Sequence, residues 1–307
     1  MRRSIVSFVC LSILLTVGGA TADILTVGPT WDYQDIQSAV NDANDGDTIL
    51  VYPGVYTDVA GNGYVVSPQY KELSIFAVNG PEETIIDGQG STRGVFSDCC
   101  TTQDPFTLEG FTIRNCVGST GAGLYFYYGT VTVTNCVFID NEADYDGGAI
   151  AASGYESSIT IGDCRFENNS ANDGGALYFY YAVNSSCTSS EFVNNTASDD
   201  GGAVFGFGWG SGDRFVFEDC EFDGNTAYDG GAIKAENVVV SNSFVGSNTS
   251  YTTPALYFTY GGRVGDTYFC LNEGGDIGGS WSDLGGNPFA ASCACPDGSC
   301  TIVVPTD

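Results

Sequence analysis

The chain has 307 residues, and its 38 acidic against 9 basic residues give it a net charge of −29. This charge excludes nucleic acid as a partner, because nucleic-acid binding needs a basic surface. The sequence contains no histidine, which excludes histidine-based acid–base catalysis, Ser-His-Asp triads and zinc sites built on histidine. The acidity does not indicate disorder, since 43% of the residues are hydrophobic and 13% are aromatic.

Residues 1–22 are typical of a secretory signal peptide. Two arginines follow the first methionine, residues 5–17 form an apolar run, and residues 20–22 are the small residues of a cleavage site. The run is too short for a permanent membrane helix, and no later segment has the pattern of a membrane span. We therefore expect a mature protein that begins near Asp23 and is secreted, either extracellular or on the cell surface.

Residues 23–46 predict an N-terminal strand and a capping helix. Residues 24–27 have strand character, and from Trp31 to Asn44 the apolar residues recur at helical spacing. A short amphipathic helix in this place would cover the open end of a solenoid core. Residues 47–265 predict the coils of that solenoid.

The strongest pattern is a motif that recurs about every 27 residues: Phe-x-x-Asn, then Asp-Gly-Gly-Ala and an aliphatic residue. Its alanines at positions 149, 176, 203 and 232 are 27, 27 and 29 residues apart. A fixed period with apolar alternation and no helical pattern predicts a solenoid in which each repeat is one coil. Strand alternation directs one aliphatic residue of each coil inward: Leu124, Ile150, Leu177, Val204, Ile233 and Leu256.

Two further parts of the motif are expected at turns. Equal positions in successive coils form ladders, and the motif thus predicts an asparagine ladder of Asn141, Asn169, Asn195 and Asn225. The glycine pairs suit turns that need a positive φ. Roughly nine coils at about 4.8 Å each would form a rod about 40 Å long.

The cysteines fall into two groups. One group has the repeat's spacing and is expected to stack inward as small apolar side chains: Cys116, Cys136, Cys164 and Cys220. The other group is expected to staple a C-terminal cap over residues 266–307, with zinc as the alternative: Cys270, Cys293, Cys295 and Cys300.

The paired Phe-x-x-Asn and Gly-Gly-Ala-Ile signatures resemble the repeats of the chlamydial polymorphic outer membrane protein family. The segment from Tyr33 through Pro53-Gly54-Val55-Tyr56 resembles the helix and first coil of many pectin-lyase-like proteins. These resemblances cover about residues 25–265 and imply an all-β fold, a right-handed parallel β-helix. The pectin-lyase-like fold hosts several carbohydrate-active enzymes, so the resemblance alone does not choose a function.

Two of those enzyme classes lack their signatures in this sequence. Polygalacturonases of the fold use Gly-His-Gly and a late Arg-x-Lys, and pectin methylesterases use a later pair of Gln-Asp and Asp-Phe signatures; the chain contains no Gly-His-Gly, no Arg-x-Lys and no Asp-Phe. A calcium-dependent polysaccharide lyase is the remaining enzymatic alternative, because Arg165 and a group of carboxylates are expected on one outer face: Asp163, Glu191, Asp219 and Glu221. The competing interpretation of Arg165 is an exposed ion pair.

The aspartates that precede the glycine pairs form a second acidic group: Asp146, Asp173, Asp200 and Asp229. One hypothesis is that each carboxylate caps the backbone N–H groups of its own Gly-Gly turn. The other is that carboxylates stacked about 4.8 Å apart bind structural calcium, which would relieve their mutual repulsion.

Aromatic residues follow the inward aliphatic residues and are expected to form a strip on the outer surface: Tyr125, Tyr127, Tyr178, Tyr180, Phe205, Phe207 and Tyr257. Such a strip suits stacking on the apolar faces of sugar rings, whereas the alternative is that the ladders only stabilise the sheet. The sequence favours a non-catalytic secreted protein that recognises extracellular polysaccharide or cell surfaces through its sheet. The alternatives are the lyase and a purely structural surface component.

Overall fold

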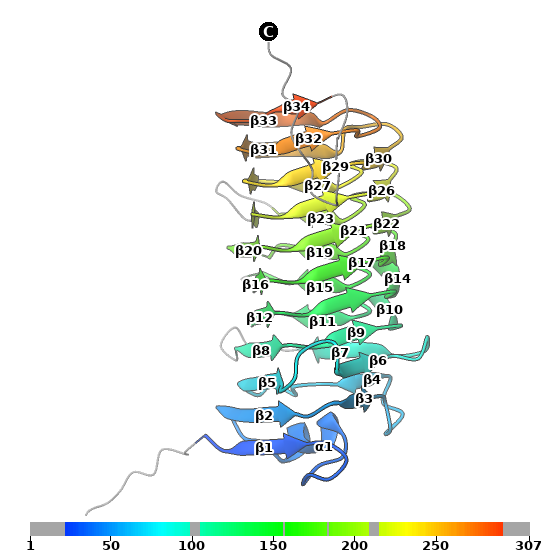
Figure 1. Cartoon of the computed structure of the whole chain (residues 1–307), viewed down its shortest axis with the longest axis vertical. Helices are drawn as coiled ribbons and strands as arrows, with labels where there is room; N and C mark the ends of the chain where they lie inside the picture. Colours follow the sequence, from blue (N-terminus) through cyan, green and yellow to red (C-terminus); the bar gives the residue numbers. More distant parts are fainter. Residues whose placement is uncertain (1–21, 99–104, 156, 183, 209–214, 291–307) are drawn as a thin grey trace, which may run out of the picture.

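The computed structural model describes residues 22–98, 105–155, 157–182, 184–208 and 215–290. In these residues the chain winds as a parallel β-solenoid whose coils stack along one axis, from strand β1 and helix α1 at one end to β33 and β34 at the other (Figure 1). The all-β solenoid predicted from the repeat is confirmed.

Within the described residues, three sheets run along the axis. The 10-stranded sheet contains β3 (Gly54–Tyr56), β6 (Thr84–Asp87), β9 (Thr112–Arg114), β13 (Val137–Ile139), β17 (Arg165–Glu167), β21 (Glu191–Val193), β25 (Glu221–Asp223), β29 (Phe244–Gly246), β32 (Tyr268–Cys270) and β34 (Phe289–Ala290). The 6-stranded sheet contains β10 (Val117–Thr120), β14 (Glu142–Asp146), β18 (Ser170–Ala171), β22 (Thr196–Ala197), β26 (Thr226–Ala227) and β30 (Thr249–Ser250).

The 18-stranded sheet consists of two rows that the long strands β31 (Leu256–Gly265) and β33 (Ile277–Gly285) join. The first row is β4 (Tyr64–Val66), β7 (Arg93–Asp98), β11 (Leu124–Tyr127), β15 (Ile150–Ser153), β19 (Leu177–Tyr180), β23 (Val204–Phe207) and β27 (Ile233–Glu236). The second row is β1 (Ile24–Val27), β2 (Asp47–Val51), β5 (Leu73–Ala77), β8 (Phe106–Glu109), β12 (Thr130–Thr134), β16 (Ser158–Gly162), β20 (Ser185–Thr188), β24 (Phe215–Glu218) and β28 (Val238–Ser241).

The register within the first row is what positions side chains of successive coils above one another. Leu124 pairs with Ile150, which pairs with Leu177, and the series continues through β23 and β27 to β31. All six predicted inward aliphatic residues are buried. Since side chains alternate along a strand, the next residue of each strand faces outward and also stacks in a ladder.

The corner between the 10-stranded and 6-stranded sheets is held by the predicted asparagine ladder. Asn141 Nδ2 donates to Asn169 Oδ1 at 2.9 Å and to the Ile113 carbonyl at 3.0 Å. The same pattern runs through Asn195 and Asn225 and extends beyond the prediction to Asn248 and Asn272. These bonds satisfy amides that would otherwise be costly to bury.

The two glycines of each repeat meet different constraints. Gly174 has φ +61°, which a side chain would disfavour, whereas a Cβ on Gly175 would lie 2.2 Å from the carbonyl oxygen of Gly202 in the next coil. The first glycine therefore makes the turn, and the second permits the coils to approach each other.

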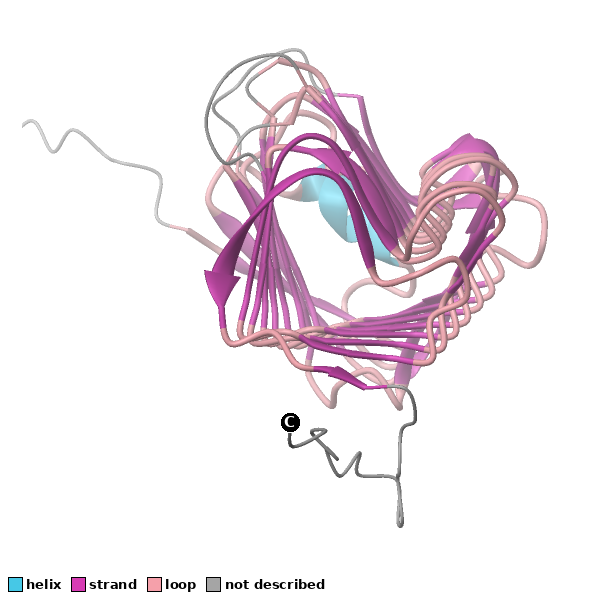
Figure 2. Ribbon diagram, turned by 90° about the horizontal axis from the view of Figure 1, so that it is seen from above, coloured by secondary structure: helices cyan, strands magenta, loops and turns pink. Residues whose placement is uncertain are grey.

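Helix α1 (Ile36–Asp42) closes the N-terminal end, where Ile36, Ala39 and Val40 are buried against the core and Asp35 caps the helix by accepting from the Ser38 N–H at 2.8 Å. Seen along the axis, the helix lies within the outline of the coils (Figure 2). It is shorter than the predicted 31–44, because the Tyr33 backbone instead bonds to Thr26 beside β1.

The inward cysteine prediction is confirmed: Cys116, Cys136, Cys164 and Cys220 are buried and unbridged, and so is Cys187. Cys270 is disulfide-bonded. The other cysteines of the predicted cap, at positions 293, 295 and 300, lie outside the described residues. In the part of the chain that the structure describes, no helix combines the length and apolar character needed to cross a membrane.

Candidate functional site

The aromatic strip lies on the outer face of the first row. Its rings stack between coils, with centroids 5.6 Å apart for Tyr178 and Phe205 and 5.9 Å apart for Tyr180 and Phe207. The stack also extends in the N-terminal direction, where Phe96 lies 5.7 Å from Tyr125. The predicted outward residues therefore form ladders, as cross-strand pairing in a parallel sheet requires.

Strand β15 interrupts these ladders. Ala151 stands in register between Tyr125 and Tyr178, and Ser153 stands between Tyr127 and Tyr180. Ala151 is completely buried and does not line a cleft, whereas Ser153, which is too small to fill the space of a ring, lines a cleft with a volume of about 520 Å³ that opens between the two tyrosine pairs. We call it the β15 cleft; its lining is Arg93, Phe96, Ser119, Thr120, Tyr125, Tyr127, Asp146, Ser153, Tyr178 and Tyr180.

Arg93, on β7, supplies the positive charge of the β15 cleft. Its guanidinium donates to Ser119 Oγ at 2.6 Å and to the Thr120 carbonyl at 3.4 Å, and it lies 5.3 Å from the centroid of the Phe96 ring. A Cβ on the neighbouring Gly118 would come within 2.9 Å of the guanidinium. Burial lowers the pKa of Arg93, although arginine keeps its charge at neutral pH.

Asp146, at the end of β14, supplies the negative charge. Burial raises the pKa of the Asp146 carboxyl, while a long hydrogen bond of 3.5 Å from Thr120 Oγ1 opposes this shift. Burial also raises the pKa of Tyr178, and the nearby Asp146 and Asp173 carboxylates act in the same direction. The Tyr178 hydroxyl therefore keeps its proton at neutral pH and remains a donor.

The sequence predicted all four tyrosines that line this cleft, and it predicted Asp146 as a metal ligand. It missed Arg93 and Phe96, which belong to a coil without the repeat motif. The strand register could have revealed Phe96, because Phe96 pairs with Tyr125 and therefore occupies the same outward position in the ladder. Phe205 and Phe207 continue the stack beyond the cleft, and Tyr257 is separated from them by a lysine in β27.

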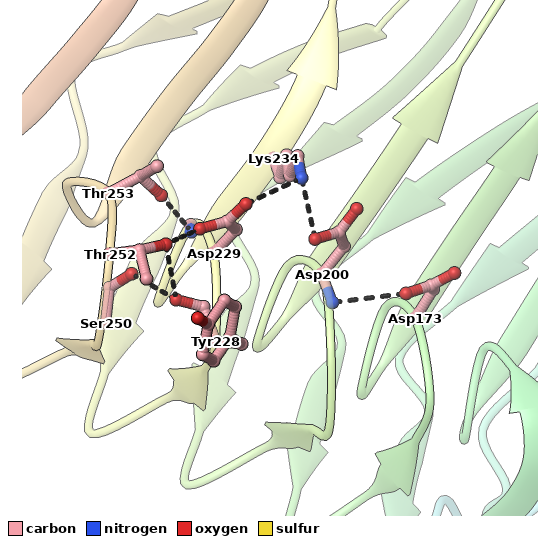
Figure 3. Close-up of polar contacts among 9 residues, drawn as sticks. Asp173, Asp200, Tyr228, Asp229, Lys234, Ser250, Thr252 and Thr253 are labelled. Carbon is pink, nitrogen blue, oxygen red and sulfur yellow. Dashed lines mark hydrogen bonds and ion pairs between the residues drawn. The ribbon is translucent and has the colours of Figure 1, made fainter.

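We call the aspartates that precede the glycine pairs the aspartate column: Asp146, Asp173, Asp200 and Asp229. Lys234 contacts two of them (Figure 3). Its ammonium lies 2.7 Å from Asp200 Oδ1 and 3.0 Å from Asp229 Oδ2. Burial alone would lower the pKa of Lys234, but the two hydrogen bonds outweigh burial and raise it. The protein's own cation thus occupies the position between two carboxylates that the sequence assigned to calcium.

The proposed capping of each Gly-Gly turn by its own aspartate is wrong. The N–H groups of Gly174 and Gly201 donate at 2.8 Å to backbone carbonyls of the next coil, and Gly230 N–H donates to Thr253 Oγ1. The carboxylates also bond between coils, since Asp173 Oδ1 accepts from the Asp200 N–H at 3.1 Å (Figure 3). The turns are satisfied by stacking, which the sequence of one repeat does not contain.

Calcium at this column stays a prediction, with a changed set of residues. Carboxylate oxygens of Asp173, Asp199 and Asp200 lie within 4.8 Å of one another, and Asp199 was not in the predicted set. These oxygens are the type that Ca²⁺ prefers, but they supply only part of the six to eight ligands that it takes.

The arginine of the lyase alternative lies on the 10-stranded sheet, away from the first row. Arg165 Nε lies 2.9 Å from Glu167, and a second ion pair joins Arg165 to Glu191. Burial lowers the pKa of Arg165, but these acidic partners outweigh burial and raise it, which opposes a role as a base.

The other predicted members of that constellation are only partly assembled. Glu221 pairs in register with Glu191, and burial followed by the charge of Glu191 raises its pKa. Asp163 and Asp219 stand at corner positions with φ +52° and +55°, and among the described residues no ion pair joins either to Arg165.

A family model described as "Right handed beta helix region" matches residues 85–249, and the chain belongs to this family. A search of curated proteins returned no match. Similar solved structures include a rhamnogalacturonan lyase, with 15% identity, a TM-score of 0.38 and coverage of 82% of this chain and 69% of that one. They also include the Azotobacter vinelandii mannuronan C-5 epimerase AlgE6 A-module, with 13% identity, a TM-score of 0.28 and coverage of 83% and 93%.

Proposed function

We propose that this chain is a secreted, non-catalytic protein that recognises extracellular polysaccharide through the β15 cleft. The observation that carries the proposal is the interruption of two aromatic ladders at one strand, which leaves a hollow between Tyr125 and Tyr178 along the axis. Its volume of about 520 Å³ falls in the range of about 300–1,000 Å³ typical of ligand sites.

The chemistry of the β15 cleft matches a sugar ring. Tyrosine rings offer apolar faces at either end of the hollow, and the exposed fractions of Tyr127 and Tyr180 are 36% and 40%. Arg93 donates hydrogen bonds and Asp146 accepts them, so both kinds of partner for sugar hydroxyls are present. The tyrosines are held by stacking before any ligand arrives, which lowers the entropic cost of binding.

The charge of the chain favours an uncharged glycan. A net charge of −29 repels polyanions, and Arg93 is one cation beside Asp146 in the same cleft. An acidic polysaccharide would need a divalent cation to bridge it to the protein.

A binding panel tests the proposal. Calorimetric titration with neutral and uronic-acid oligosaccharides, with and without Ca²⁺, should give saturable binding to at least one neutral glycan. Tyr178→Ala should weaken that binding by about tenfold or more, the equivalent of about 1.4 kcal/mol. The matched control is Tyr251→Ala, since Tyr251 is 73% exposed and outside the cleft.

Two results would contradict the proposal. One is equal loss of binding in both tyrosine variants. The other is turnover, seen as ultraviolet absorbance of unsaturated products from a uronic-acid polysaccharide, that depends on Ca²⁺ and disappears in Arg165→Ala. That second outcome would establish the lyase alternative.

A further inference from the structure

The N-terminal end of the described chain contains an unusual hydrogen bond to a buried carboxylate. The backbone nitrogen of Asp23 donates to Asp47 Oδ1 at 2.7 Å, and the Asn44 N–H donates to Asp47 Oδ2, also at 2.7 Å. Asp47 is only 3% exposed. The carbonyl of Asp23 in turn accepts from Thr48 N–H at 2.9 Å, so both backbone groups of Asp23 are fixed to the start of β2.

The position of this bond coincides with the cleavage point expected from the sequence. Residues 20–22, Ala-Thr-Ala, have the small-residue pattern of a signal-peptide site, and the bond after Ala22 joins it to Asp23. Ala22 and Asp23 are both exposed, whereas the partner carboxylate is buried. The bond after Ala22 is therefore exposed, next to the residue whose nitrogen contacts Asp47.

We propose that the Ala22–Asp23 bond is a processing site and that the new α-ammonium of Asp23 forms an ion pair with Asp47 that locks the N-terminal cap. A peptidase of the signal-peptidase class would hydrolyse the bond with water. The water hydroxyl goes to the Ala22 carbonyl carbon, and its remaining hydrogen goes to the Asp23 nitrogen. The resulting amine takes up one more proton from solvent and becomes an ammonium.

The surroundings explain why a cation is needed here. Before cleavage, the buried Asp47 carboxylate accepts hydrogen bonds from neutral N–H groups, and among the described residues no ion pair joins it to a cation, which leaves part of the cost of burying its charge unopposed. Those two N–H bonds, from Asn44 and then Asp23, lower the pKa of Asp47 against the opposing effect of burial, with a smaller contribution from Lys71. The Lys71 ammonium itself is bonded to the Val40 and Asn41 carbonyls.

Other carboxylates face the same place. A cleft of about 400 Å³ beside β1 is lined by Asp23, Asp32, Asp42 and Asp47, together with Ile24, Leu25, Tyr33 and Asn44. An ammonium at the Asp23 nitrogen would thus enter a strongly negative field and keep a charge-assisted bond of the same geometry. Its other two hydrogens would face solvent, because Asp23 is exposed.

The proposal does not depend on what the β15 cleft binds. The first test is the N-terminal residue of protein recovered from the medium of secreting cells, determined by intact mass and terminal sequencing. We expect Asp23. A mature chain that starts at another residue would overturn the proposal.

The second test is the melting temperature of the mature protein with its native Asp23 amine, compared with the same chain carrying Gly-Ser before Asp23. The native form should melt at least about 2 °C higher, since an ion pair to a buried carboxylate replaces a neutral bond. Asp47→Asn should abolish this difference, whereas the matched control Asp42→Asn, in the same cleft, should leave it. Equal melting temperatures for the two wild-type forms would contradict the ion pair.

If Asp47→Asn fails to fold, the Asp23 amine itself provides the readout. An amine-reactive ester should label Asp23 at least about tenfold more slowly in the folded protein than in urea, because an ion-paired ammonium is a poor nucleophile. Equal labelling rates would overturn the proposal.

Discussion

Two residues at the same ladder position, Ala151 in β15 and Lys234 in β27, interrupt the aromatic stack in opposite ways. Both are in register with the column that contains Tyr178 and Phe205. Ala151 is too small to replace a ring and is itself completely buried, and the β15 cleft opens at Ser153 of the same strand. Lys234 turns instead to Asp200 and Asp229 and fills its place with two ion pairs. In a solenoid, a change of residue type in one coil is thus enough to convert a continuous aromatic surface into either a cleft or a pair of ion pairs between coils.

The largest effect is expected from restoring a ring at the interruption in β15. Ser153→Tyr would continue the ladder between Tyr127 and Tyr180 and occupy the cleft. We expect glycan binding to fall by about a hundredfold or more, the equivalent of about 2.8 kcal/mol, while the melting temperature stays unchanged. Calorimetric titration measures the first and thermal unfolding the second.

The control for that variant is Thr160→Tyr, which adds the same ring at an exposed position of β16 in the second row. It should bind like the wild type. Wild-type affinity in Ser153→Tyr would mean that the ligand does not enter the cleft.

The next largest effect is a loss of stability, and it is expected at Lys234, which interrupts the aromatic ladder in β27. Lys234→Met keeps the apolar stem but removes the charge between Asp200 and Asp229, whose side chains are 18% and 21% exposed. The free energy of unfolding should fall by about 2 kcal/mol, within the range of about 1.5–3 kcal/mol for hydrogen bonds to charged groups. Urea unfolding at pH 7 measures this loss.

A double variant separates charge from packing. If Lys234 acts by neutralising the column, Asp200→Asn should cost less stability in the Lys234→Met background than in the wild type. Purely additive losses would show that the lysine acts by packing alone. Added Ca²⁺ should also stabilise Lys234→Met more than the wild type, because the variant leaves carboxylates without a cation.

The smallest effect is a change of stability with pH at Asp173, which lies between the coils of Ala151 and Lys234. Burial raises the pKa of Asp173 to about 6, and the charges of Asp200 and Asp146 act in the same direction. A carboxyl whose pKa is higher in the folded state stabilises the fold below its unfolded pKa of 3.8, and this contribution is lost as pH rises through about 6. Allowing for solvent screening at this partly exposed site, the loss is about 1 kcal/mol.

Urea unfolding between pH 4 and pH 7.5 tests this expectation. Asp173→Asn should remove that part of the pH dependence and be more stable than the wild type at pH 7. Asp144→Asn, an exposed aspartate of β14, is the matched control and should keep the wild-type profile. A profile for Asp173→Asn that parallels the wild type would contradict the assignment.

The features that one repeat encodes were predictable from the sequence. The inward aliphatic residues and the asparagine ladder follow from alternation and a period of about 27 residues, and they hold even where spacing changes to 29. The positive φ of Gly174 follows from its residue type in a turn.

The features that depend on contacts between particular coils were not predictable. The cleft at Ser153 depends on which rings lie in the strands before and after β15, and Arg93 lies in a coil that lacks the motif. The hydrogen-bond partners of the carboxylates in the aspartate column also depend on how the coils stack, since Asp173 Oδ1 accepts from the Asp200 N–H of the next coil. The predicted helix was too long because apolar spacing at Trp31 and Tyr33 serves packing against β1 and the first coil.

The most direct test of the central claim is a crystal structure of the protein with the neutral oligosaccharide that binds most tightly. We expect a sugar ring in the β15 cleft, stacked between Tyr125 and Tyr178 and within hydrogen-bond distance of Arg93 or Asp146. A saturating glycan found on another face, with the cleft holding no part of it, would contradict the account.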